Sequence, residues 1–140
     1  MKALKYMVMA VCLLFGSCQP NQKSEKLYEE GVSLELAQLR KQEIKDLKYG
    51  LSFSIPEKKQ ETVEAEMKVR FTIQRPQEII LDFRESADKI KEVSVNGQPT
   101  DYRFEKEHLI IPEEATAKGA NEIDIRFTAG DQSLNRNDEF

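Results

Sequence analysis

The chain has 140 residues and a formal net charge of −4 at pH 7, which is enough for one domain and lacks the basic patch of a nucleic-acid-binding protein. It contains one histidine and two cysteines, whereas a hydrolytic zinc site uses several such residues. We therefore expect neither a metal or other cofactor nor a nucleic-acid partner for this chain.

Residues 1–17 have the pattern of a secretory signal. Two lysines precede an apolar run over residues 6–15, which is too short to span a bilayer and typical of a signal-peptide core. Leu-Phe-Gly-Ser at 14–17 leads directly to Cys18. This resembles the lipobox of bacterial lipoproteins, although Phe15 stands where an aliphatic residue is usual. We therefore expect cleavage before Cys18 and lipidation of its thiol; the alternative is an ordinary signal peptide cleaved nearby, with Cys18 incidental.

A lipidated Cys18 would tether the chain to a membrane. Residues 18–32 begin with a polar stretch, which predicts a flexible tether ahead of a domain at 33–140. We expect a protein of the bacterial cell envelope that is lipid-anchored and faces the periplasm, because no acidic run follows Cys18. Since Cys12 leaves with the signal, the mature chain keeps no disulfide and no cysteine nucleophile.

The domain is expected to begin with a short helix over residues 33–43, for which Ser33 is a suitable N-cap. Two long runs, at 47–55 and 63–73, then alternate apolar and polar residues. A period of two places the apolar side chains on one face of a strand and the charges on the other. Both runs therefore predict strands with one buried face and one solvent face, as antiparallel sheets have. Their apolar positions are Leu47, Tyr49, Leu51, Phe53 and Ile55, then Val63, Ala65, Met67, Val69, Phe71 and Ile73.

Shorter apolar segments with strand spacing follow, separated by turn signals. They lie at 79–83, 93–95, 102–104, 108–111 and 123–127. The dipeptide Asn96-Gly97 is a strong signal for a tight turn. Together these segments predict an all-β, mainly antiparallel fold: a β-sandwich or saddle-like sheet with a short N-terminal helix.

Residues suited to catalysis are scarce. His108, the one histidine, lies in an apolar strand segment, so an ordinary strand histidine is favoured over a metal ligand or a member of a Ser-His-Asp triad. Residues 131–135 resemble the start of a calcium loop, but Arg136 stands where such a loop needs glycine. Glu64 and Glu66 fall on the polar face of a predicted strand. We therefore predict no catalytic, metal-binding or substrate-binding residue.

Several segments form an ordered series along the chain. They are Tyr-Gly-Leu-Ser-Phe at 49–53, Leu-Asp-Phe at 81–83, Val-Ser-Val-Asn-Gly at 93–97 and Gly-Ala-Asn-Glu-Ile-Asp-Ile-Arg-Phe at 119–127. In this order they resemble strands of the N-terminal β-domain of M1 zinc metallopeptidases, the family of aminopeptidase N. The resemblance covers residues 33–140. It implies a domain that packs on a thermolysin-like catalytic domain and helps to wall the substrate cavity.

The resemblance also implies that a separate domain carries out catalysis. The family's Gly-x-Met-Glu-Asn and His-Glu-x-x-His motifs are not in this sequence, so zinc is expected only in a catalytic domain that partners this chain in cis or in trans. Alone the chain would be inactive, and the domain at 33–140 would be incomplete at its C-terminus. The alternative is a stand-alone lipoprotein module whose sandwich face binds a peptide, a glycan or a protein partner.

Overall fold

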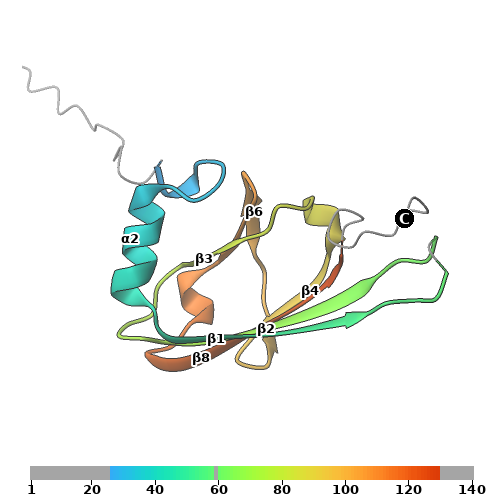
Figure 1. Cartoon of the computed structure of the whole chain (residues 1–140). Coiled ribbons are helices and arrows are strands. Elements are labelled where there is room, and N and C mark those ends of the chain that lie inside the picture. Colours follow the sequence, from blue (N-terminus) through green and yellow to red (C-terminus); the bar gives the residue numbers. More distant parts are fainter. Residues whose placement is uncertain (1–25, 59, 130–140) are drawn as a thin grey trace, which may run out of the picture.

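The computed structural model describes residues 26–58 and 60–129 and shows a mainly antiparallel β-protein with one short α-helix near its N-terminus (Figure 1). The large sheet has five strands. In spatial order they are β1 (Lys45–Ser54), β2 (Glu64–Ile73), β8 (Gly119–Thr128), β4 (Ile90–Val95) and β5 (Gln98–Pro99). The small sheet contains β3 (Ile79–Asp82), β7 (His108–Ile111) and β6 (Arg103–Glu105). Every strand pair is antiparallel, so the predicted fold class is confirmed.

The core lies between the two sheets. Because strand side chains alternate between faces, Val69 and Phe71 of β2 point the same way as Ile123 and Ile125 of β8, and all four are buried. The small sheet supplies the opposite side of this core through alternate residues of two paired strands. These residues are Ile79, Leu81, Leu109 and Ile111. The two sheets therefore form a sandwich around one shared apolar layer.

The predicted helix forms as α2 (Leu34–Glu43). Ser33 is its N-cap, and the Ser33 side chain accepts a hydrogen bond of 3.1 Å from the backbone N–H of Leu36. Leu36 is fully buried against Ile80 and Ile110, which are paired neighbours in β3 and β7. The helix therefore covers the outer face of the small sheet, whose inner face forms the core.

The hairpin turn predicted at Asn96-Gly97 connects β4 to β5. Asn96 has a φ of 52° and Gly97 a φ of 78°, the left-handed backbone that such a turn requires. The Asn96 side chain also binds the neighbouring strand: its Nδ2 donates to Asn121 Oδ1 at 3.0 Å, and its Oδ1 accepts from Glu122 N at 3.0 Å. The turn is thus fixed to β8 as well as by its own geometry.

Residues 26–29, which the sequence places in the tether, pack against the domain. A 3₁₀ turn over Lys26–Tyr28 directs the Tyr28 side chain to the carboxylate of Glu78, and the backbone oxygen of Glu29 lies 2.8 Å from His108 Nε2. The folded unit thus includes residues ahead of 33. The expected signal peptide, Cys18 and the calcium-like segment at 131–135 lie outside the described residues. Among the described helices, none is long and apolar enough to cross a membrane.

Candidate docking site on the edge strand

All positions of β1 are exposed, on both of its faces. Five large apolar residues along β1 and just beyond it are between 44% and 60% exposed. We call them the apolar stripe: Leu47, Tyr49, Leu51, Phe53 and Ile55. The prediction of a buried face was therefore wrong for 47–55. It is confirmed for 63–73, where Val63, Ala65, Val69, Phe71 and Ile73 are buried and Met67 is partly buried.

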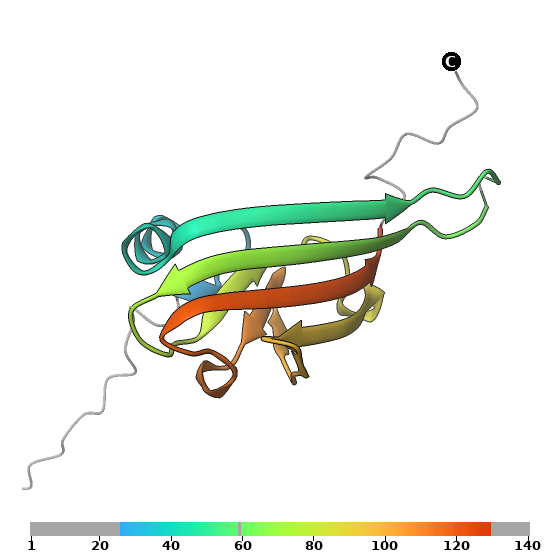
Figure 2. The ribbon, with the colours of Figure 1, turned by 90° about the horizontal axis from the view of Figure 1, so that it is seen from below.

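The apolar stripe continues the core face of the large sheet. Tyr49 pairs with Val69, and Leu51 pairs with Met67; directly paired residues of neighbouring strands project to the same side of a sheet. Figure 2 shows β1 as an outer strand of the large sheet, with β2 as its neighbour. The strands of the small sheet, at three or four residues each, cover the core face of β2 and leave that of β1 open.

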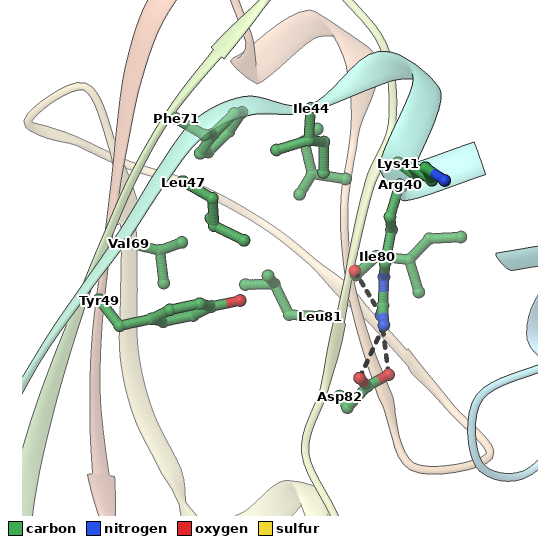
Figure 3. A pocket seen from close by; sticks show the side chains of 11 residues that line it. Arg40, Lys41, Ile44, Leu47, Tyr49, Val69, Phe71, Ile80, Leu81 and Asp82 are labelled. Atoms are coloured by element: carbon green, nitrogen blue, oxygen red, sulfur yellow. Dashed lines mark hydrogen bonds and ion pairs between the residues drawn. The ribbon is translucent and has the colours of Figure 1, made fainter. Parts of the chain in front are cut away.

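A cleft of about 280 Å³ opens between β1 and β3. We call it the β1–β3 cleft. Its apolar walls come from both sheets, and its rim is formed by charged residues of α2 and β3 (Figure 3). The apolar lining is Ile44, Leu47, Tyr49, Val69, Phe71, Ile79, Ile80 and Leu81, and the rim is Arg40, Lys41 and Asp82. A mainly apolar pocket with a few polar groups at its edge is the usual form of a binding site.

The Arg40–Asp82 ion pair fixes the rim of the cleft. Arg40 donates from Nη1 to one carboxylate oxygen of Asp82 and from Nη2 to the other, both at 2.7 Å. Its Nη2 also donates to the backbone oxygen of Ile80 at 2.8 Å (Figure 3). This bidentate contact links α2 to β3. The contact joins residues far apart in the chain, and no local sequence signal marked it.

His108 lies next to Asp82 and is fully buried. Its Nδ1 is 3.2 Å from Asp82 Oδ1, outside hydrogen-bonding alignment, and its Nε2 is 2.8 Å from the backbone oxygen of Glu29. The ring thus links β7 to the N-terminal segment through Nε2, and neither ring nitrogen is exposed to solvent. This agrees with the strand role predicted for His108, which lies in β7.

The outer face of the large sheet is a network of ion pairs. Glu122 of β8 accepts from Arg70 and, at 3.1 Å, from Lys68 of β2. The hydrogen bond from Arg70, followed by that from Lys68, lowers the pKa of Glu122. Glu64 is similarly paired, at 2.6 Å, with Lys91. Glu64 is exposed and Glu122 is partly exposed, and both are paired with cations, so they form a solvated surface, as predicted for Glu64.

Comparison with known proteins does not identify the family of this chain. No protein-family model matches the sequence, and no curated protein matches it. Within residues 26–58 and 60–129, no group of three or more His, Cys, Asp and Glu side chains is placed to hold a metal ion. The apolar stripe and the β1–β3 cleft are the features of the described residues from which a function can be argued.

Proposed function

We propose that this chain is the non-catalytic N-terminal β-domain of a membrane-tethered zinc aminopeptidase of the M1 type. In this proposal it docks on a catalytic domain, present in cis or in trans, and forms part of the wall of the substrate cavity. The supporting observation is the apolar stripe, because side chains on the core face of a sheet are normally covered by another folded unit. The ordered resemblance over 33–140 suggests which unit that is.

The burial of the single histidine supports a proposal in which the partner, and not this chain, provides the zinc site. A catalytic zinc ion needs several protein ligands, and His108 is buried with Glu29 and Asp82 as its neighbours. Zinc and the groups that activate water would therefore come from the catalytic domain. This chain would supply a scaffold and a docking surface.

The proposal is tested with the mature chain, made from residue 18 onward with Cys18→Ser so that it stays unlipidated. We expect no release of amino acids from aminoacyl substrates. The DNA after the codon for Phe140, or a neighbouring reading frame, should encode His-Glu-x-x-His, and the product should co-purify with the mature chain. Cleavage by the mature chain alone that a chelator abolishes would contradict the proposal.

We also propose that Cys18 carries a lipid that holds the domain at the periplasmic side of the bacterial envelope. The support is the lipobox-like sequence ahead of Cys18. Cells fed labelled palmitate should label the wild-type chain and leave the Cys18→Ala variant unlabelled. Label that persists in Cys18→Ala would rule out this anchor.

The second candidate is a stand-alone lipoprotein module that binds a peptide, a glycan or a protein. It is favoured by the β1–β3 cleft, which combines apolar walls with a charged rim. The two candidates differ in genetic context. If no reading frame nearby encodes His-Glu-x-x-His, the stand-alone module is the better explanation.

A further inference from the structure

We infer that β1 is a docking edge for an extended polypeptide segment of the partner. The segment pairs with the free backbone edge of β1 and places alternate apolar side chains beside the apolar stripe, on the same face of the sheet. Its acidic residues face the cations Lys41, Lys45 and Lys48. This inference rests on the docking role proposed above and specifies its chemistry.

The backbone of β1 provides the first line of support. Among the described strands, β1 pairs with β2 alone, so one edge of a strand of 10 residues presents unpaired N–H and C=O groups. Exposed edges are normally protected by proline, by charged side chains, by β-bulges or by a covering element. A register shift between Lys45 and Lys48 interrupts the start of β1, but from Lys48 to Ser54 the strand pairs with β2 in continuous register. Residues 47–55 contain no proline, and their one charge, Lys48, lies across from Arg70 on the outer face. The edge is therefore open to strand addition, a common mode of peptide recognition.

The second line of support is the spacing of the apolar groups. Residues of the apolar stripe recur at every second position, which is the spacing of side chains on one face of an added strand. At the α2 end of β1, Leu47 and Tyr49 form one wall of the β1–β3 cleft, and Leu81 lies on the opposite wall (Figure 3). Side chains on the same face of a segment along β1 would contact Leu47 and Tyr49.

Charge provides the third line of support. Lys41, Lys45 and Lys48 are exposed around the start of β1, and none of them makes an ion pair with a described residue. Lys45 donates instead to the backbone oxygen of Lys41 at 3.0 Å, and Asp46 is the one acid between Lys45 and Lys48. This end of the edge therefore carries excess positive charge, which favours acidic residues in the partner.

A second copy of the chain and a lipid surface fit these observations less well. Pairing two β1 edges would satisfy the backbone, but Asp46, the one acidic residue of β1, could not balance the lysines that each copy carries around the start of this strand. A bilayer could cover the protruding side chains, but it offers no ordered donors and acceptors to the free edge. It also could not reach Val69 and Leu81 inside the cleft. An extended polypeptide with alternating apolar and acidic residues matches the free backbone edge, the apolar stripe and the positive charge together.

The test measures binding of a fluorescent peptide by anisotropy, using the mature chain with Cys18→Ser. The probe has the length of β1 and alternates valine with glutamate. We expect saturable binding that weakens at least about tenfold for three altered probes, which is a loss of about 1.4 kcal/mol. One probe has the same composition in scrambled order, one has lysine in place of glutamate, and one is methylated on alternate backbone nitrogens.

Matched variants locate the site. Tyr49→Ser should abolish binding, whereas Val32→Ser, which removes another exposed apolar side chain away from β1, should not. Lys48→Glu should weaken binding, whereas Lys118→Glu, at an exposed site before β8, should not. Circular dichroism must show all variants folded. Equal binding of the alternating and scrambled probes, or no binding of either, would overturn the inference.

Two further measurements test the two other possible occupants of this surface, a second copy of the chain and a membrane. We expect the chain to stay monomeric in sedimentation equilibrium and to remain unbound to phosphatidylglycerol vesicles. Dimerisation or vesicle binding that Tyr49→Ser removes, without peptide binding, would assign the apolar stripe to a second copy or to a membrane. If the catalytic polypeptide co-purifies but the probe does not bind, the inference fails and the proposed function stands. Chelator-sensitive cleavage by the chain alone would contradict the function instead.

Discussion

Tyr49 of β1 lies directly opposite Val69 of β2, yet Tyr49 is 57% exposed and Val69 is 1% exposed. The two side chains share one face of the same sheet. They differ in what covers them, because the small sheet packs on β2 and does not extend over β1. The boundary of the core thus runs between two paired strands, and it leaves an apolar surface where a sandwich would normally be closed.

Because of this boundary, replacing a leucine by alanine should have a large effect on stability at Leu109 and a small effect at Leu51. Leu51 is 54% exposed, whereas Leu109 is 1% exposed in the core. Leu109→Ala should lower the free energy of unfolding by about 2–5 kcal/mol, because it leaves a cavity. Leu51→Ala should change it by no more than about 0.5 kcal/mol. Urea denaturation of both variants checks this, and a large loss for Leu51→Ala would mean that β1 is covered in solution.

The contacts of Arg40 predict that its removal costs more than removal of its partner Asp82. Asp82→Ala breaks a partly exposed ion pair and should cost about 1 kcal/mol of unfolding free energy. Arg40→Ala removes the same pair and also the hydrogen bond to the backbone oxygen of Ile80, so its cost should be larger. Thermal and urea unfolding of the two variants give the comparison.

Arg40→Lys serves as the control for this pair. A lysine keeps the charge but cannot reach both oxygens of Asp82 and the backbone oxygen of Ile80 in the geometry of a guanidinium. It should therefore recover only part of the stability that Arg40→Ala loses. Full recovery would show that charge alone holds α2 against β3.

Local patterns in the sequence predicted the elements of this fold well. Ser33 marked the start of α2, the alternation at 63–73 marked a half-buried strand, and Asn96-Gly97 marked a hairpin turn. These features depend on neighbours within a few residues, so periodicity and turn chemistry are sufficient to find them.

Features that depend on the second layer were not predictable in this way. Alternation at 47–55 shows that its apolar side chains share a face, but not whether another sheet reaches that face. The rim of the β1–β3 cleft needs Arg40 to meet Asp82, a residue 42 positions later in the chain. Such contacts follow from the packing of whole elements, and a single sequence contains no local signal for them.

The ion pairs on the outer face predict a loss of stability in acid. Arg70 and Lys68 hold the pKa of Glu122 below its ordinary value of 4.5. A carboxylate with a lowered folded-state pKa adds stability above its unfolded-state pKa, and this contribution is lost as the pH falls through the folded-state value. The free energy of unfolding should therefore decrease as the pH falls below 4.5.

Glu122→Gln identifies the source of that decrease. The variant should be less stable than the wild type at neutral pH, and its stability should depend less on pH below 4.5. The difference between the two proteins should shrink at high salt, because exposed ion pairs are screened. Urea denaturation across the acid range measures this, and parallel pH profiles for the two proteins would exclude Glu122 as the source.

Gly97, in the turn between β4 and β5, and Gly50, in β1, together isolate the effect of backbone conformation. A Cβ added at Gly97 or at Gly50 would meet no atom within 4 Å, but only Gly97 has a positive φ, at 78°. Gly97→Ala should therefore cost about 1 kcal/mol, since L-residues are strained in the left-handed region. Gly50→Ala should be neutral or stabilise the protein slightly, because it restricts the unfolded chain. Urea denaturation of both variants measures the difference. Equal effects would mean that the turn after β4 adopts a different conformation in solution.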